Sequence, residues 1–325
     1  MPLWRRVLDV AVCVITGGAG NLACQLTWRL ASQFNRVVLF DVAPAPIGEV
    51  SGNAVFERGD LLDAAQLEGL FKRHRPTTVI HLASLLSGSC EQDRPRAWQV
   101  NMDGSFALFE AVLRHGKPQI LFASTVAAFG GKLPEVLTDD TPQWPDGLYG
   151  VTKMAVERLG IYYQRKHGLD FRCLRLPITI SRHAPAGAAS ALASHAFIEA
   201  ARGGEFTFRA RPDTKLALIY IRDVLHAITG LLDRPVKHLT QRVYNISGMT
   251  VTPRQIADAI QRRVVAARLK FETDDAVADL LASWPGVIDD RAARRDWDWK
   301  PEFDLERTAD DFLSSLKSEE ANAKP

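Results

Sequence analysis

The sequence predicts an α/β fold: a doubly wound parallel sheet with a smaller C-terminal lobe. Two observations predict it. Short apolar runs alternate with helical patterns along the first half of the chain, and a glycine-rich segment separates the first apolar run from the first helix. Continuous runs of Val, Ile and Leu are typical of strands covered on both faces. Repetition of strand and helix favours a parallel sheet.

The expected elements follow this alternation in chain order. The first strand is expected to begin at Val10 and to include the apolar run at 12–16. Further strands are expected at 37–41, 77–83, 119–124 and 171–179. Helices are expected at 20–33, 94–115 and 149–167. After Pro177 the pattern loosens, and 183–194 is rich in small residues, as in a loop that enters a helix.

Composition excludes several classes of protein. The chain has 325 residues with 40 Lys and Arg against 38 Asp and Glu, so the formal net charge is +2. This balance gives no electrostatic argument for a nucleic-acid or membrane partner. The apolar run near the N-terminus is too short to span a membrane. The four cysteines are scattered without a C-x-x-C pair, which favours a reducing cytoplasm. No histidines and carboxylates show ligand spacing, so no metal is expected.

The glycine-rich turn Thr16–Ala23 indicates a dinucleotide site. It follows a strand and opens a helix, where Gly17, Gly20 and the N–H groups of Asn21 and Leu22 are expected to approach a diphosphate. Asp41 ends the next strand, where a carboxylate accepts hydrogen bonds from ribose hydroxyls and repels a 2′-phosphate. No arginine follows Asp41 directly, so the expected cofactor is NAD.

This site defines the expected domains of a Rossmann fold. Residues 1–179 are expected to form the NAD-binding domain, with strands 219–224 and 243–247 returning to it. Residues 180–218 and 250–306 are expected to form the substrate lobe, and 307–325 a C-terminal helix and frayed tail.

Tyr149 and Lys153 form a candidate catalytic pair. They stand at i and i+4, on one face of the expected helix. A nearby cation favours the phenolate, so Lys153 is expected to lower the pKa of Tyr149 and make it a usable base. Ser124 and Thr125 close the preceding strand at its carboxyl end, where such sheets bind ligands. Either hydroxyl is a candidate to hold a substrate oxygen.

Together these motifs resemble the extended short-chain dehydrogenase/reductase family, also called the NAD-dependent epimerase/dehydratase family. The matching segments are TGGAGNLA (16–23), Asp41, Gly59-Asp60-Leu61, HLAS (81–84), VNMDG (100–104), FASTVAAFG (122–130), YGVTK (149–153) and RLP (175–177). The resemblance implies that Tyr149 is the base, that Lys153 binds the nicotinamide ribose, and that Thr125 occupies the catalytic Ser/Thr position with Ser124 beside it. It further implies cofactor contacts from Asp60, Leu61, Leu82, Ala83, Ser84, Asn101 and Pro177.

The C-terminal stretch 283–306 resembles short-chain-type L-threonine 3-dehydrogenases, whereas the substrate loop is more similar to D-erythronate dehydrogenase-like oxidoreductases. Both relatives oxidise a secondary alcohol on a small carboxylate-bearing molecule, so such a polar hydroxy acid is the expected substrate. Arg182 is the candidate for its carboxylate. The other candidate substrate residues are Ser87, Thr179, Ser190 and Trp284, the last as a lid.

Two alternatives stay open. A nucleotide-sugar 4-epimerase or dehydratase would retain its NAD, but the position where such members usually carry an arginine is Leu216, with Lys215 adjacent. A non-catalytic NAD-sensing regulator is the remote alternative, and the presence of Tyr149 and Lys153 disfavours it. The resemblance also implies a homodimer through the helices around 94–115 and 149–167.

Overall fold

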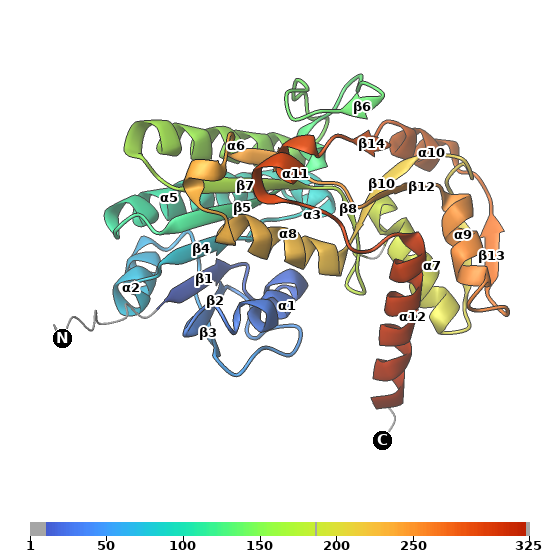
Figure 1. The fold of residues 1–325 in the computed structure, drawn as a ribbon, viewed down its shortest axis with the longest axis horizontal. Coiled ribbons are helices and arrows are strands. Elements are labelled where there is room, and N and C mark those ends of the chain that lie inside the picture. The colour runs from blue at the N-terminus through green and yellow to red at the C-terminus, as the bar shows by residue number, and fades with distance from the viewer. Residues whose placement is uncertain (1–10, 186, 323–325) are drawn as a thin grey trace. The chain divides into compact units, whose positions relative to one another are not determined.

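The computed structural model describes residues 11–185 and 187–322, with side chains described up to residue 317 (Figure 1). By its internal contacts the chain divides into two compact units. The first comprises Met1–Ser124, Gly147–Leu174 and Leu231–Lys237. The second comprises Thr125–Asp146, Arg175–Gly230 and His238–Pro325. The functional assignment of the ranges 1–179, 180–218 and 250–306 stays a prediction.

A seven-stranded sheet forms the centre of the fold, in the order β11-β7-β5-β4-β1-β2-β3. The pairs β1–β2, β1–β4, β2–β3 and β4–β5 are parallel. The strands are β1 (Val12–Thr16), β2 (Arg36–Asp41), β3 (Ala54–Arg58), β4 (Thr78–His81), β5 (Gln119–Thr125), β7 (Phe171–Leu176) and β11 (Val243–Asn245). The predicted doubly wound α/β fold is confirmed. Val10, the expected start of the first strand, lies outside the described residues.

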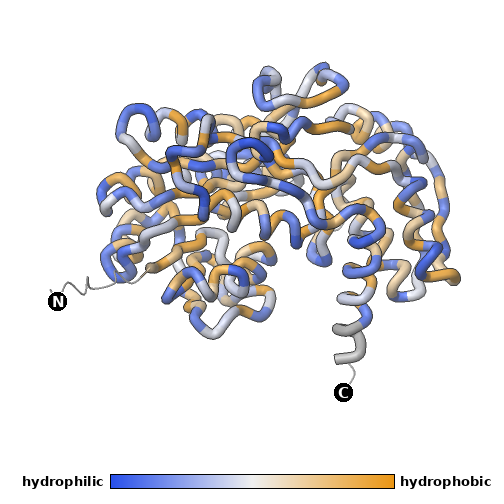
Figure 2. Tube along the Cα trace, viewed as in Figure 1, coloured by the Kyte–Doolittle hydropathy of each residue, from blue (hydrophilic) through white to orange (hydrophobic). Residues whose placement is uncertain are grey.

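The inner strands carry the core of the first unit. Every residue of β1 and β4 is buried, as expected for continuous apolar runs with helices on both sides. Figure 2 shows apolar stretches along the sheet strands and hydrophilic residues in many of the loops. The helices of this unit are α1 (Asn21–Leu30), α2 (Ala64–His74), α3 (Ser87–Gln92), α4 (Arg94–Trp98), α5 (Gly104–Arg114) and α6 (Leu148–His167).

The helix expected over 94–115 contains a wider turn in its middle. The residues Gln99–Asp103 (η1) between α4 and α5 form a π-helix. A π-helical turn inserts an extra residue and often occurs at functional sites. Its position brings the buried Asn101 into contact with the neighbouring loop and helix, as described below.

The single strand expected over 171–179 is wrong, because Pro177 divides it. β7 ends at Leu176, and β8 (Ile178–Ile180) pairs with β10 (Leu216–Tyr220) in a separate three-stranded sheet with β12 (Met249–Val251). Proline has no N–H to continue a ladder, so the chain changes sheets at this residue.

The strand expected at 219–224 is also corrected. β10 does not return to the central sheet, because it pairs with β8 in parallel and with β12 in antiparallel orientation. Ile221 already begins the helix α8 (Ile221–Asp233). The strand expected at 243–247 does belong to the central sheet, as β11.

The second unit surrounds the small sheet with helices and two short strand pairs. Phe197 on α7 packs against Phe312 on α12, with ring centroids 5.8 Å apart. The remaining elements are η2 (Val126–Ala128), β6 (Val136–Leu137), η3 (Ala189–Ala191), α7 (Leu192–Ala201), β9 (Glu205–Phe208), η4 (Val236–His238), α9 (Pro253–Gln261), β13 (Arg268–Phe271), α10 (Asp275–Ala282), β14 (Val287–Ile288), α11 (Arg291–Trp297) and α12 (Leu305–Asn322).

α12 continues to Asn322, so most of the tail expected to be frayed is helical, and 323–325 lie outside the described residues. Within the described residues, no helix combines the length and the apolar character that crossing a membrane requires.

Candidate active site

The glycine-rich turn lies so close to neighbouring backbone that two of its positions have no room for a side chain, and glycine is required there. Gly17 has φ +70°, and a Cβ on it would lie 2.7 Å from the Ala83 nitrogen. A Cβ on Gly18 would lie 2.6 Å from the Leu39 backbone. Gly20 differs, since its Cβ would meet only the Gly17 oxygen at 3.3 Å. Gly17 and Gly18 are therefore required by packing, and Gly20 is free to serve a ligand.

The first turn of α1 fits a diphosphate. Gly20 is its N-cap residue, so no side chain caps the turn, and no acidic residue lies in it. Asn21 and Leu22 are the first two helical residues, as predicted. N–H groups at a helix N-terminus, with the favourable end of the helix dipole, attract phosphate oxygens. The residues present thus fit the phosphates of a dinucleotide.

The crowded position of Gly18 and the open position of Gly20 give a matched pair of variants. Gly18→Ala is expected to lower the free energy of unfolding by about 1–3 kcal/mol, because its methyl group overlaps the backbone of β2. Gly20→Ala is expected to keep the melting temperature and to weaken NAD binding about tenfold. Thermal melting and calorimetric NAD titration measure both effects. A Gly20→Ala protein that melts early but binds NAD normally would contradict this assignment.

Asp41 and Asp60 lie at the carboxyl edge of the sheet. The two Asp41 oxygens accept hydrogen bonds from the backbone N–H groups of Ala19 (3.0 Å) and Ala43 (2.9 Å), which fix the carboxylate beside the glycine-rich turn. Asp60 accepts from the N–H of Leu62 (2.9 Å) and lies 3.6 Å from the Arg96 guanidinium. Leu61 is buried. The adenosine contacts expected of Asp41, Asp60 and Leu61 stay predictions.

The loop after β4 is held to the turn and to α6. The N–H of Leu82 donates to the Thr16 carbonyl (3.1 Å), and Ala83 lies against Gly17. Ser84 follows in the same loop. Asn101 bonds both backbone groups of Leu85 (2.8 and 3.1 Å).

Asn101 also donates to the Thr152 hydroxyl on α6 (3.1 Å) and is buried. Its side chain is committed to the protein, so it positions the loop and α6. The cofactor contact expected for it stays a prediction. Ser87, the first residue of α3, is exposed.

Tyr149 and Lys153 share one face in the first turns of α6. The Lys153 ammonium lies 5.6 Å from the centroid of the Tyr149 ring and 4.7 Å from that of Phe122. It donates to the Ala123 carbonyl (2.9 Å), and only 3% of Lys153 is exposed. The predicted pair is therefore formed in the folded chain, with the cation buried beneath the phenol ring.

Burial sets the electrostatics of Lys153. It lowers the pKa of the ammonium to about 8, because a charge is poorly solvated there, while Cys173, Cys90 and Glu157 act in the opposite direction. Below that pH the ammonium carries a full charge close to Tyr149.

Ser124 and Thr125 differ in what their hydroxyls do. Ser124 donates to Glu157 at 2.5 Å, and both side chains are buried. Thr125, which is half-buried, accepts from the N–H of Ala127 (3.1 Å). Its hydroxyl hydrogen has no acceptor within the described residues. Thr125 is thus the hydroxyl able to donate to a substrate oxygen, whereas Ser124 is committed to Glu157.

Glu157 was not identified from the sequence. It follows Lys153 by one helical turn, and this i+4 spacing places it on the same face. The sequence pattern that points to Glu157 is a carboxylate four residues after the candidate lysine, on a helix face that is otherwise largely apolar.

Four predicted residues of the second unit lie in or beside β8: Pro177, Thr179, Arg182 and Ser190. Thr179 donates to the Pro177 carbonyl (3.2 Å). Arg182 is half-buried, and burial lowers the pKa of its guanidinium while Tyr220 opposes this. Ser190 lies in η3, which packs against β8. Their contacts with cofactor or substrate stay predictions.

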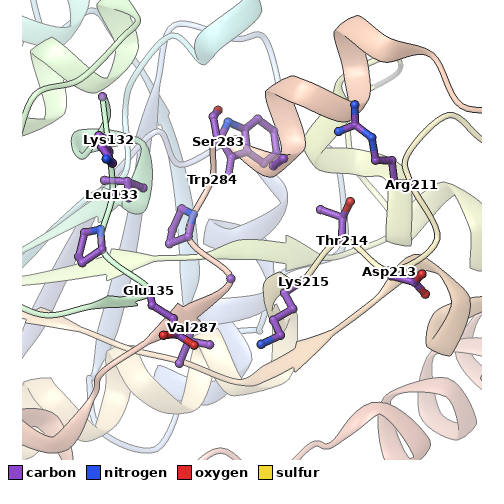
Figure 3. Close-up of a pocket in the computed structure, with 15 residues that line it drawn as sticks. Lys132, Leu133, Glu135, Arg211, Asp213, Thr214, Lys215, Ser283, Trp284 and Val287 are labelled. Carbon is purple, nitrogen blue, oxygen red and sulfur yellow. The ribbon is translucent and has the colours of Figure 1, made fainter.

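Trp284 lines a separate open cleft of about 800 Å³ within the second unit (Figure 3). Lys132 and Lys215 face this cleft, and Arg211 at its margin bonds Asp279 (2.7 Å). Thr125, Thr179, Arg182 and Ser190 are absent from the described lining. Nothing in this cleft supports the lid role expected of Trp284, which stays a prediction.

His81 is a buried core residue and no base. Its ring nitrogens bond the hydroxyls of Thr16 (2.7 Å) and Ser105 (2.9 Å). Burial, aided by the charge of Lys153, lowers the pKa of His81 to about 3, so the ring is neutral. In the part of the chain that the structure describes, no group of histidine, cysteine and carboxylate side chains is arranged to hold a metal.

Comparison with known proteins identifies the family of the chain. Residues 13–247 match the model of the NAD dependent epimerase/dehydratase family. The mitochondrial L-threonine 3-dehydrogenase of Bos taurus is 35% identical over 310 residues, or 94% of this chain and 83% of the relative. The holo GalE-like L-threonine dehydrogenase from Cupriavidus necator superposes with a TM-score of 0.87 at 32% identity, covering 94% of this chain and 99% of that chain.

A second solved structure, the L-threonine dehydrogenase from Clostridium difficile, gives a TM-score of 0.89 at 29% identity, over 95% of this chain and 98% of that chain. The cofactor is NAD, and the reaction is dehydrogenation of a CH–OH group. By these matches, the chain belongs to the NAD-dependent epimerase/dehydratase family.

Proposed function

We propose that this enzyme oxidises the secondary hydroxyl of a small carboxylate-bearing molecule, either an L-threonine-like β-hydroxy amino acid or a sugar acid such as D-erythronate. The observation that carries the proposal is the buried Lys153 ammonium, 5.6 Å from the Tyr149 ring. A cation there favours the phenolate and so makes Tyr149 a base for an alcohol.

The chain's own residues handle the proton and the orientation. Tyr149 takes the hydroxyl proton, and Thr125 donates a hydrogen bond to the same oxygen and holds it in place. NAD, when bound, supplies the hydride acceptor. The turn at Gly17–Gly20, Asp41 and Lys153 would hold it. Because Lys153 retains its own proton, its charge stabilises the phenolate form of Tyr149, which becomes neutral when it takes the substrate proton.

Arg182 is the proposed carboxylate ligand. A guanidinium offers two parallel N–H donors to a carboxylate. Its half-buried position past β8 supports this role, because partial burial strengthens a charge-assisted hydrogen bond. Arg182→Lys is therefore expected to raise KM for the acid more than it lowers kcat.

A screen for NADH production tests the function. The purified enzyme with NAD is offered L-threonine, other β-hydroxy amino acids and aldonates of four to six carbons, and NADH absorbance is followed. Relatives named as L-threonine dehydrogenases support threonine, and the different substrate loop supports a sugar acid. Retained NAD and isomerisation of a nucleotide sugar without NADH release would favour an epimerase instead.

One observation disfavours the epimerase. Leu216 stands where nucleotide-sugar members usually carry an arginine, and it is buried. The adjacent Lys215 is exposed and lines the cleft with Trp284. A nucleotide diphosphate would thus lack its usual cation at this position. A non-catalytic regulator would bind NAD yet give no product with any of these compounds.

The two hydroxyls at the end of β5 give a direct comparison. Thr125→Val is expected to lower kcat/KM about 100-fold, and Thr125→Ser to restore most of it. Ser124→Ala is expected to change kcat less than about fivefold but to cost about 1–3 kcal/mol of stability, because the buried Glu157 loses the hydrogen bond from the Ser124 hydroxyl. Steady-state kinetics and urea unfolding measure both. A larger kinetic loss in Ser124→Ala would exchange the two roles.

We also propose a homodimer in the cytoplasm. Three large side chains are half-exposed on the helices expected to pair: Trp98 on α4, Phe106 on α5 and Tyr162 on α6. Burying them against a second copy would be favourable. The four cysteines are free thiols, in keeping with a reducing compartment. Sedimentation equilibrium at micromolar concentration tests the dimer, and a monomer would contradict it.

A further inference from the structure

Arg58 lies beside Asp41 at the carboxyl edge of the central sheet. β3 pairs in parallel with β2, and the register sets Arg58 opposite Asp41. Figure 1 shows the two strands side by side at the end of the sheet. Neighbouring strands are about 4.8 Å apart. The sequence shows no arginine directly after Asp41, but the pairing of the strands brings one to it.

The guanidinium of Arg58 is held in place but is not neutralised. Its Nε donates to the Val42 carbonyl (3.1 Å), at the first residue of the loop after Asp41. Arg58 is exposed, and its Nη atoms make no hydrogen bond within the described residues. Neither Arg58 nor Asp41 has an ion-pair partner there. Two Nη donors therefore remain for an anion next to the ribose position.

Asp41 occupies the other side of that position. Its oxygens accept from Ala19 and Ala43, one N–H each, which leaves lone pairs for the ribose hydroxyls of NAD. Asp60 and Arg96 pair with each other at 3.6 Å. Removal of the Asp41 charge would thus leave Arg58 as the uncompensated cation beside the ribose.

We propose that Arg58 is the cationic half of a binding site for a phosphate monoester at the ribose 2′ position, and that the Asp41 carboxylate alone keeps this site closed. A guanidinium binds phosphate with two N–H donors, and the Asp41 carboxylate repels the same group. The discrimination against NADP then depends on one charge. This inference rests on the NAD assignment and not on the substrate proposed above.

Binding of two fragments, measured without substrate, tests the proposal. Calorimetry compares ADP with adenosine 2′,5′-bisphosphate at low ionic strength, since exposed charges are screened by salt. Asp41→Asn, a neutral isostere, is expected to raise the affinity for the bisphosphate at least about tenfold, because the repulsion is gone and Arg58 remains. Asp41→Ser removes the same charge with a smaller side chain and is expected to behave alike.

The role of Arg58 is isolated by a second substitution. In Asp41→Asn/Arg58→Gln the gain should disappear. In Asp41→Asn/Arg36→Gln, which removes an exposed arginine from the opposite end of β2, it should persist. The melting temperature controls for an intact turn, and ADP affinity is expected to fall because the ribose contacts of Asp41 are lost. A gain that survives Arg58→Gln would overturn the proposal, and so would the absence of a gain in both Asp41 variants with the melting temperature unchanged. An inactive enzyme in the substrate screen leaves this result unaffected.

Discussion

Tyr149→Phe is expected to lower kcat about 1000-fold while the Kd for NAD changes less than about threefold. The substitution removes one oxygen, the proposed acceptor of the substrate proton, and a general base contributes a factor of this size. The ring stays in place above Lys153, so the cofactor site is preserved. Stopped-flow or steady-state NADH formation, together with calorimetric NAD binding, separates the two effects.

Tyr162→Phe is the matched control. It makes the same chemical change on the same helix, at a residue that is 51% exposed. Tyr162→Phe keeps the ring that is proposed to contact a second copy, so it is expected to retain full turnover. A Tyr149→Phe enzyme with undiminished turnover would rule out Tyr149 as the base and would direct the search to another proton acceptor.

Lys153→Met is expected to lower kcat/KM about 100-fold and to move the acidic limb of its pH profile to higher pH. The ammonium favours the phenolate of Tyr149, so without it the base forms only at higher pH. Lys166→Met, an exposed lysine near the end of α6, controls for the loss of one positive charge on the same helix. An unshifted acidic limb in Lys153→Met would contradict the electrostatic role.

The same variant should change how stability depends on pH. The folded pKa of Lys153, about 8, lies below its ordinary value of 10.5, so between these values the unfolded chain binds more protons. The free energy of unfolding of the wild type should therefore rise with pH across that window, and this contribution should vanish in Lys153→Met. Urea unfolding at several pH values, compared with Lys166→Met, measures the difference.

Much of the fold follows from local patterns. The strands β1, β2, β4 and β5 were predicted because their buried runs are continuous and lie between clear helical stretches. The prediction failed where one residue interrupts a run. Pro177 sends β8 into the second sheet, and β10 follows it there, because a strand joins the sheet in which its hydrogen-bonding partner lies. Apolar periodicity does not specify that partner.

Sequence spacing predicted the parts of the candidate site that are close together along the chain: the turn at Gly17–Gly20, the Asp41 that ends the next strand, and the Tyr149–Lys153 pair. Each depends on spacing within one strand, turn or helix. Tertiary structure decided which hydroxyl is committed and which is not, because Ser124 meets Glu157 only when α6 packs on β5. It also brought Arg58 to Asp41 through the pairing of β2 and β3. Contacts between separate elements depend on register and packing, which no local pattern encodes.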